Sequence, residues 1–553
     1  MKGPPLLTKS LLYLRTIVRM KPGMILSRLR GQKTVSKRLL GSCGHRMTIP
    51  ALAIEELDCD SRIGMRFDID ALAQDEFFII NNRYKVDLDK WSVEEAAHLW
   101  NFNLHYFEYC IPLAVRYREH RNVDDWRQFK RIVSSWVDAC PYAQGDAWHP
   151  YTISLRLVNW LICLDLFGEV VYEDRGFFQR LVDSMYLQYR HLLLNQEKHL
   201  LANHYFENLK TLLICAAVFD ERDVYDSVLA AFEVQLDEQI LNDGVHFERS
   251  LMYHKLILEG LLRVDIAARY MGYPLPSAMR EKEQLMLDAM SSLERGMGKT
   301  PFFNDAAEGV AKECDQMVAA CENAIGLLAD DSKTSFPDAG YYKLYDGDMA
   351  VMFDAGDPGP RYMLGHAHCD ALSFELSVKG KPLVVNSGTY GYQSELRSYF
   401  RSTAAHNTCV IDGEDQLECW GEHRVARGAR NIKVLEQDAF EVDAVLDNYR
   451  RARHRRHIRL EGLALEIEDS ADGSISASLT IAPEAAVSRC EVGYRIEREG
   501  VCLLVVSRAH SSLEDATYSS ELGVLNKTKR IVFKGDRSVF CGITLDSNCE
   551  ENE

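Results

Sequence analysis

The hydrophobic periodicity of this chain changes once, from a helical to a strand-like spacing, and this change constrains the fold more than any other feature. From about residue 91 to residue 328, apolar residues recur three and four positions apart, as in ISLRLVNWLICLDLF and LKTLLICAAVF. After residue 336, runs such as LSFELSVKGKPLVV and RIEREGVCLLVVSR alternate apolar with polar residues between Gly and Asp turns, which is typical of antiparallel strands. We therefore predict a helical domain over residues 91–335 and a β domain over residues 336–553, with ligands in the cleft between them.

The start of the chain differs from the rest in charge. Residues 1–50 contain eleven Lys and Arg and no Asp or Glu, although the whole chain has a net charge of -18. We predict that residues 1–90 form a basic extension that packs on the helical domain, with peripheral contact to an acidic membrane surface as the alternative. Charges interrupt each apolar run here, and no stretch reaches the ~18 uncharged apolar residues of a transmembrane helix.

Composition restricts the partners and the compartment. The negative net charge argues against nucleic acid as a partner, and binding of an anion would require a local cluster of positive charge. The 15 cysteines are scattered without a CxxC pair, which favours buried thiols over a disulfide framework. We expect a cytoplasmic or inner-membrane-associated protein, with the periplasm as the alternative; the oligomeric state is open.

Two polar clusters interrupt the helical half. Asn203 and His204 open LANHYFENLKTLL, where an Asn cap beside a half-exposed His would be an ordinary structural explanation. Arg249 and Tyr253 lie in DGVHFERSLMYHKLILEG, and a Tyr at the start of a helix is more often a packing residue than a catalyst. Neither cluster assigns a function by itself.

Two further clusters lie in the β half. His366 and His368 form an HxH pair in GHAHCDALSFEL, and the two-residue period of a strand would place both imidazoles on one face, which suits a metal. A solvated strand edge is the commoner explanation of such a pair. Arg397 and Arg401 precede His406, and Arg424, Arg427 and Arg430 follow soon after, so this region could hold an anion or pair with the acidic surface.

Other catalytic signatures are missing from the sequence. There is no GxSxG elbow, no Walker A loop, no convincing GxGxxG and no HExxH. A glycosidase carboxylate pair has no short signature, and Asp305 in PFFNDAAEG is one candidate for it.

Eight stretches occur in a fixed order between about residues 101 and 430: FNLHYFEYC, WHPYTISLRLVNW, ANHYFENLKTLL, ERSLMYH, FFNDAA, GHAHCDALSFEL, NSGTYGY and RSTAAHNTCVIDGEDQLECWG. Together they make the chain resemble the heparinase II/III-like family of polysaccharide lyases, and among these the members found in bacterial surface-polysaccharide clusters. The resemblance implies an incomplete (α/α) toroid followed by an antiparallel β-sandwich, in agreement with the two periodicities. It also implies an acidic polysaccharide or oligosaccharide as the substrate.

The chemistry implied by the resemblance is β-elimination at a uronic acid. By this resemblance Asn203 would bind the substrate carboxylate with His204 beside it, and Tyr253 would act as acid and also as base. A phenol with a pKa near ~10 must be lowered to act as a base, so positive charge is expected near Tyr253. His366 would be a second acid/base or carboxylate contact. Arg249, Arg397 and Arg401 are expected to hold substrate charge.

The resemblance also implies a divalent, zinc-like ion in the sandwich. The matching positions are His368, Asn386 and His406, and Asn386 stands in VVNSGTY where metal-binding relatives have an aspartate. A neutral amide is a poor zinc ligand, so occupancy of this site is left open. If no metal binds, His368 and His406 would hydrogen-bond to each other's loops.

Our functional prediction is a carbon–oxygen lyase acting on a uronic-acid-containing polysaccharide, linked to bacterial surface polysaccharide. Two alternatives remain. One is a non-catalytic member of the same fold that binds polysaccharide during assembly or export, and the other is a toroid-type glycoside hydrolase with a carboxylate pair.

Overall fold

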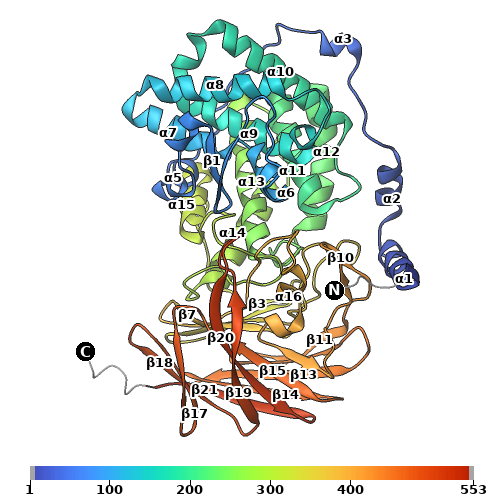
Figure 1. Cartoon of the computed structure of the whole chain (residues 1–553), viewed down its shortest axis with the longest axis vertical. Helices are drawn as coiled ribbons and strands as arrows, with labels where there is room; N and C mark the ends of the chain where they lie inside the picture. Colours follow the sequence, from blue (N-terminus) through green and yellow to red (C-terminus); the bar gives the residue numbers. More distant parts are fainter. Residues whose placement is uncertain (1–5, 547–553) are drawn as a thin grey trace.

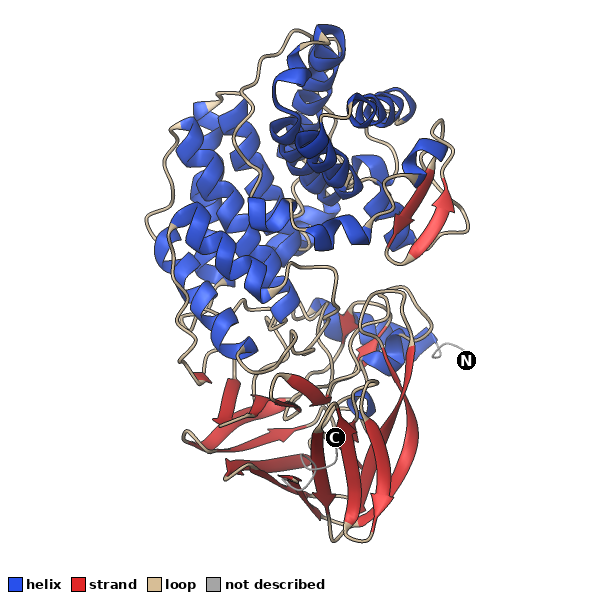
Figure 2. Ribbon diagram, turned by 90° about the vertical axis from the view of Figure 1, so that its left-hand side faces the viewer, coloured by secondary structure: helices blue, strands red, loops and turns tan. Residues whose placement is uncertain are grey.

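The computed structural model describes residues 6–546 and divides the chain into a helical and a β domain, one above the other (Figure 1). Most helices gather at one end and most strands at the other (Figure 2). The last long helix ends at Ile325 and the first strand of the β domain begins at Ser335, so the change of periodicity marks the change of architecture.

The helical domain is an incomplete toroid of antiparallel helix pairs around an apolar core. Its main helices are α6 (His98–Leu104), α7 (Ile111–His120), α8 (Val123–Ala139), α9 (Pro150–Phe167), α10 (Arg175–Leu194), α11 (Ala202–Val218), α12 (Arg222–Gln239), α13 (Leu251–Met271), α14 (Met279–Glu294) and α15 (Cys314–Ile325). Helices α9, α11 and α13 are buried along most of their length, and their interiors are accordingly apolar on nearly all sides.

Helix starts in this domain follow the local sequence. The carboxamide oxygen of Asn122 accepts from the backbone N–H of Asp124 at 3.1 Å and caps α8. Pro150 occupies the first turn of α9, where a missing N–H costs nothing. Ser250 caps α13, and its Oγ accepts from the backbone N–H of Tyr253 at 3.4 Å.

The β domain consists of antiparallel sheets packed as a layered sandwich. One sheet has the order β3-β4-β5-β6-β7, the second β19-β20-β15-β8, and the largest β11-β12-β13-β14-β21-β18-β17-β16. Their bounds are β3 (Ser335–Phe336), β4 (Tyr341–Asp346), β5 (Met349–Asp354), β6 (Phe374–Val378), β7 (Lys381–Val384), β8 (Cys409–Ile411), β11 (Arg430–Gln437), β12 (Glu441–Asp447), β13 (Arg453–Glu461), β14 (Ala464–Ala471), β15 (Ile475–Thr480), β16 (Ala486–Cys490), β17 (Gly493–Arg498), β18 (Val501–Val506), β19 (His510–Tyr518), β20 (Asn526–Gly535) and β21 (Ser538–Leu545).

Strand burial follows the alternation seen in the sequence. Along β13 and β14, every second residue is buried and the residues between face solvent, as half-buried strands require. Loops of this domain also carry helix α16 (Arg397–Phe400) and the short ribbon of β9 (Cys419–Trp420) and β10 (Arg424–Val425). These loops face the helical domain (Figure 1).

The two domains share buried apolar side chains. Val245, Leu251 and Phe303 of the helical half pack in one cluster with Tyr341 and Met352 of the first sheet. Burial of such side chains contributes about 1.5–3 kcal/mol each, so the domains are held in a fixed relation rather than joined by a loose linker.

We predicted that residues 1–90 pack on the toroid as one extension, but the structure divides this segment between the two domains. Helix α1 (Leu6–Ile17) lies instead against the ribbon of the β domain, where Arg15 pairs with Glu418 at 3.1 Å and Tyr13 packs edge-on against Trp420. The chain then runs along the helical domain through α2 (Pro22–Leu29) and α3 (Lys37–Leu40) (Figure 1). Salt bridges and aromatic contacts to the ribbon are the physical reason for this split.

The rest of the extension belongs to the toroid itself. Its elements are α4 (Glu55–Asp58), α5 (Ser61–Arg66), β1 (Glu76–Ile79) and β2 (Asn82–Lys85). Leu52, Ile54, Leu57 and Phe77 are buried in the same apolar cluster as the long helices. Within residues 6–546, no helix combines the length and apolar character needed to span a bilayer.

Candidate active site

A cleft of about 830 Å³ opens where the toroid meets the β domain. The toroid contributes Asn203, His204 and Tyr253 to its lining, and the β domain contributes His366 and Tyr392. The structure thus brings together all four residues that the sequence analysis proposed as catalytic.

Asn203 and His204 lie in the first turn of α11, after a turn in which Leu201 and Ala202 both have positive φ. The side-chain oxygen of Asn203 is buried and has no hydrogen-bond partner among residues 6–546, so this amide has free capacity for a ligand. His204 Nδ1 lies 2.9 Å from Oε1 of the buried Glu197.

Glu197 fixes the charge of His204. Burial lowers the pKa of His204, but the charge and hydrogen bond of Glu197 outweigh burial and raise it above its usual value. Burial opposes ionisation of Glu197, yet the charge of His204 and its hydrogen bond bring the pKa of Glu197 to about 2. The pair therefore favours the protonated form of the imidazole at the cleft.

Tyr253 is held by the cap of α13 and by two rings. Ser250, the capping residue, also donates to the backbone carbonyl of Asp305 at 2.7 Å, which ties the helix start to the neighbouring loop. The hydroxyl of Tyr253 lies 2.9 Å from that of Tyr392, and its ring centre lies 4.2 Å from that of His366.

We expected positive charge beside Tyr253, but its charged and polar neighbours are Tyr392 and the carboxylate of Asp305. Burial, followed by the neighbouring Tyr392 and the carboxylate of Asp305, raises the pKa of Tyr253 well above its usual value. Our prediction of a lowered pKa was therefore wrong for the protein without substrate. Tyr253 is a protonated donor.

Asp305 is the hub of the site, although it comes from the helical half of the chain. Its buried carboxylate accepts from His366 Nδ1 at 2.9 Å, from His368 Nε2 at 2.8 Å, and from Arg397 Nη2 at 2.7 Å. Its backbone N–H donates to the carbonyl of His366 at 3.0 Å. Burial opposes ionisation, but Arg397 and the histidine hydrogen bonds hold the pKa of Asp305 well below its usual range.

The state of Asp305 excludes the role we had considered for it in a hydrolase. Each carboxylate of a glycosidase pair must reach the substrate, whereas Asp305 is fully buried and its oxygens accept from His366, His368 and Arg397. The carboxylate instead orients His366, because Nδ1 donates to Asp305 and the lone pair then lies on Nε2.

The three arginines predicted to hold substrate charge do other work. Arg397 forms an ion pair with Asp305. Arg401 donates to the carbonyls of Ala367 and Glu422 at 3.0 and 3.2 Å. Arg249 donates to the carbonyl of Ala339 at 2.7 Å, beyond the cleft lining. None of the three lines the cleft, since their guanidinium groups are needed to satisfy buried acceptors.

Sequence reasoning missed three residues of the site. Tyr392 lies in the quoted stretch NSGTYGY, which could have indicated it, and it is the hydrogen-bond partner of Tyr253. Glu197 and Glu248 carry no local signal, yet Glu197 charges His204 and Glu248 Oε1 lies 3.9 Å from His366 Nε2. Burial raises the pKa of Glu248 above its usual value.

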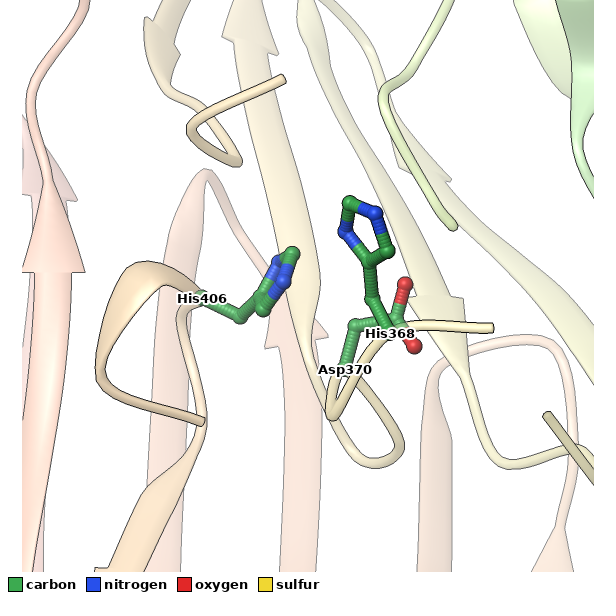
Figure 3. A group of neighbouring side chains, drawn as sticks. All are labelled: His368, Asp370 and His406. Carbon is green, nitrogen blue, oxygen red and sulfur yellow. The ribbon is translucent and has the colours of Figure 1, made fainter. Parts of the chain in front are cut away.

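A group of potential metal ligands lies behind His366. His368, Asp370 and His406 converge, with ligand atoms within 4.8 Å of one another (Figure 3). His368 Nδ1, His406 Nδ1 and Asp370 Oδ1 are all buried without a hydrogen-bond partner among the described residues. Since His368 Nε2 contacts Asp305 and His406 Nε2 contacts the carbonyl of Phe400, both Nδ1 atoms are left as lone-pair donors.

The third ligand expected from the sequence, Asn386, is used differently. Its side-chain oxygen accepts from Ser373 Oγ at 2.8 Å, and the carboxylate that joins the two histidines is Asp370. Two imidazoles and a carboxylate fit a divalent, zinc-like ion better than two imidazoles and an amide. Such an ion would hold the loop of His368 against the loop of His406.

We predict that zinc stabilises the protein through this group. At about 100 times its Kd, an ion that binds only the folded state adds about 2.7 kcal/mol to the free energy of unfolding. Thermal melts with zinc and with a chelator measure the shift, and His406→Ala should abolish it. His510→Ala, at the exposed first residue of strand β19, is the control, and an equal response of His406→Ala and wild type would contradict the prediction.

The protein is of the toroid-and-sandwich class: a helical toroid and a β-sandwich enclose an interdomain cleft lined by Asn, His and Tyr. Residues 46–335 match the family described as Heparinase II/III N-terminus, and residues 330–549 match Heparinase II/III-like, C-terminal. The chain belongs to the heparinase II/III-like family.

Relatives and solved structures agree with this assignment. The chain is 24% identical over 506 residues to "FtsZ-localized protein C" of Caulobacter vibrioides, a match that covers 85% of this chain and 82% of that one. It is 21% identical over 389 residues to a "Heparin-sulfate lyase" of Pedobacter heparinus, covering 63% of this chain and 57% of the relative. A crystal structure of heparinase III superposes with a TM-score of 0.73 at 16% identity, covering 96% of this chain and 93% of that one, and shares the fold.

Proposed function

We propose that the protein is a carbon–oxygen lyase that cleaves a uronic-acid-containing polysaccharide by β-elimination in the interdomain cleft. The observation that supports this most is the grouping of a charged His204, a neutral Tyr253 and an Asp305-oriented His366 around one cleft. Two of the curated relatives, from Pedobacter heparinus and Bacteroides thetaiotaomicron, are heparin-sulfate lyases by name.

The first requirement of the reaction is to neutralise the substrate carboxylate. The C5 proton of a uronate is weakly acidic while the neighbouring carboxylate is charged, because removal of the proton builds up further negative charge on that group. The protonated His204 and the unsatisfied amide of Asn203 lie together in the cleft and supply that stabilisation.

The second requirement is a base and an acid. His366 Nε2, with Nδ1 held by Asp305, takes the proton from C5, and the electron pair of that bond forms the C4–C5 double bond. The bond from C4 to the leaving oxygen breaks, and the hydroxyl of Tyr253 supplies the proton to that oxygen. The turnover closes when His366 releases its proton to solvent and Tyr253 regains one from solvent, for which Tyr392, 2.9 Å from Tyr253, is a relay.

The cleft favours a substrate of modest charge. Its cations Arg66, Lys210, Arg263 and Lys312 each lie within ion-pair distance of a carboxylate, so they are already largely neutralised. A heavily sulfated polymer would need additional free cations in the cleft. We therefore propose an unsulfated uronate polymer, such as heparosan, as the substrate class.

The test of the proposed function is the appearance of the C4–C5 double bond. This bond is conjugated to the carboxylate, so a lyase product absorbs in the ultraviolet, whereas a hydrolase yields only new reducing ends and a binding protein yields neither. Unsulfated uronate polymers and heparin should be compared. If no polymer gives the absorbance, the non-catalytic polysaccharide-binding protein is the favoured alternative. The relative named FtsZ-localized protein C would then be a second protein with which to compare this chain.

We predict that activity falls on the alkaline side because of His204. A histidine with a raised pKa is charged below that value, so binding of the substrate carboxylate is complete at low pH and lost as the pH rises through it. His204→Gln should remove this limb of the kcat/KM profile and lower kcat/KM by roughly tenfold to hundredfold. His510→Gln is the matched control, and a limb that persists in His204→Gln would refute the assignment.

We also propose that helices α1 and α2 contact an anionic membrane surface, alongside a cytoplasmic or inner-membrane-associated location. Val18 and Leu29 are 76% and 78% exposed, and Leu14 and Leu26 are exposed near the basic residues of the same segment. Co-sedimentation with anionic vesicles should be lost in a Leu26→Asp, Leu29→Asp double variant. Neutral vesicles are the control, and equal binding of the double variant and wild type would oppose the proposal.

A further inference from the structure

A second cavity, of about 690 Å³, lies beside the catalytic cleft and is lined by positive side chains. We call it the arginine pocket, defined by Arg19, Arg249, Arg361, Arg430 and Lys433. It is formed by the N-terminal segment, the connection between the two domains and the edge strand β11.

The arginine pocket shares two chain segments with the catalytic cleft. Leu364 lines the pocket and His366 lines the cleft, and these are only two residues apart. Arg249 lines the pocket and Tyr253, in the next turn of the chain, lines the cleft. Neighbouring stretches of the chain therefore line both cavities.

The charges of the arginine pocket are not neutralised by ion pairs. Among residues 6–546, no carboxylate lies within ion-pair distance of the side-chain nitrogens of its five cations, whereas nearby Arg15 and Arg427 both pair with Glu418. Asp338 and Asp357 also line the pocket, so a positive excess remains. In a chain with a net charge of -18, such an excess is unusual and attracts anions.

Two of the arginines repel each other. Burial, followed by the charge of Arg430, lowers the pKa of Arg19, and Glu418 opposes this only in part. A Cβ on Gly428 would come within 3.3 Å of the Arg19 guanidinium, so a glycine at this position leaves the space in which Arg19 lies. An anion between Arg19 and Arg430 would relieve their repulsion, and guanidinium groups bind carboxylates in a bidentate manner.

The N-terminal segment is anchored on both sides of Arg19. Arg15 pairs with Glu418 of the β domain, and Lys21 pairs with Glu238 of α12 and lies 4.1 Å from the ring centre of Tyr362. Tyr362 in turn donates to Glu238 at 2.8 Å. These contacts hold Arg19 over the pocket.

We propose that the arginine pocket is an accessory subsite that binds a carboxylate-bearing sugar of the same acidic polysaccharide whose scissile uronate occupies the cleft. This rests on the proposed function for the identity of the ligand. The subsite supplies the free positive charge that the cleft itself lacks. It selects long acidic chains over short ones, because only a long chain spans both cavities.

The test compares a short and a long ligand. With Tyr253→Phe as the parent, so that the ligand survives, calorimetry measures the affinity for a heparosan tetrasaccharide and for a heparosan dodecasaccharide. Adding Arg19→Glu and Arg430→Glu should weaken dodecasaccharide binding at least about tenfold and leave tetrasaccharide binding within about twofold. Arg489→Glu, on the opposite edge strand β16 of the same sheet, is the matched control and should change neither.

Two results would overturn the subsite. One is dodecasaccharide binding that is equal with and without the two substitutions in proteins that melt at the same temperature. The other is equal weakening of both ligands, which would indicate a general effect on the cleft. Failure of the proposed lyase function would give a different result. Wild type would then form no absorbing product, while the charge-dependent preference for the longer ligand would persist.

Discussion

Replacing the hydroxyl of Tyr253 by hydrogen, in Tyr253→Phe, is expected to reduce kcat by roughly 10²–10⁴, the usual contribution of a positioned acid or base. The phenol lies at the cleft, 2.9 Å from the hydroxyl of Tyr392 and with its ring against that of His366, in position to protonate the leaving oxygen. The raised pKa of Tyr253 keeps its proton available at neutral pH. Without this proton, the leaving oxygen must depart as an alkoxide.

The fold should survive this change, which makes the result interpretable. The phenylalanine ring retains the contact with His366, and only the hydrogen bond to Tyr392 is lost, at a cost of about 1 kcal/mol. Tyr225→Phe is the matched control, because Tyr225 is also buried and its hydroxyl donates to the carbonyl of Pro274 away from the cleft. Initial rates by product absorbance measure both variants, and a Tyr253→Phe rate equal to that of Tyr225→Phe would exclude Tyr253 as the acid.

The architecture could be predicted from sequence because it depends on local periodicity. The three-and-four spacing of α9 and α11 and the alternation of β13 and β14 are properties of short windows, and the structure shows the corresponding burial. The resemblance to the family then supplied the order of the motifs and the four residues that meet at the cleft. The family assignment is confirmed by the matches over both domains.

The partners of those residues could not be predicted, because they are contacts between distant segments. Asp305 and Arg397 are 92 residues apart, and nothing in PFFNDAAEG or ELRSYF indicates that they pair. The same holds for Asp370, which replaces the expected Asn386 beside the two histidines, and for Arg249, which faces another cavity. A charged residue in a motif shows that charge is needed, whereas its partner is decided by the packing.

Asp305→Asn is the substitution with the second large expected effect, and it acts on stability and activity together. The carboxylate neutralises the buried Arg397, so its removal leaves a guanidinium without a counter-charge, which costs about 3–5 kcal/mol of the free energy of unfolding. It also removes the acceptor that fixes Nδ1 of His366 as the donor, and loss of such an orienting carboxylate lowers kcat by roughly 10⁴ in serine proteases. Urea unfolding and product absorbance measure the two effects separately.

The pH dependence distinguishes loss of this charge from a general packing defect. A carboxylate whose folded pKa is depressed stabilises the protein above its unfolded pKa of about 4, and this stabilisation is lost as the pH falls through the folded value. The difference in unfolding free energy between wild type and Asp305→Asn should therefore be largest near neutral pH and narrow in acid. Asp89→Asn, at an exposed aspartate away from both cavities, is the control and should show no such difference. A gap that stays constant from neutral pH into acid would mean that Asp305 acts through its shape, and the charged hub would then not be what orients His366 for catalysis.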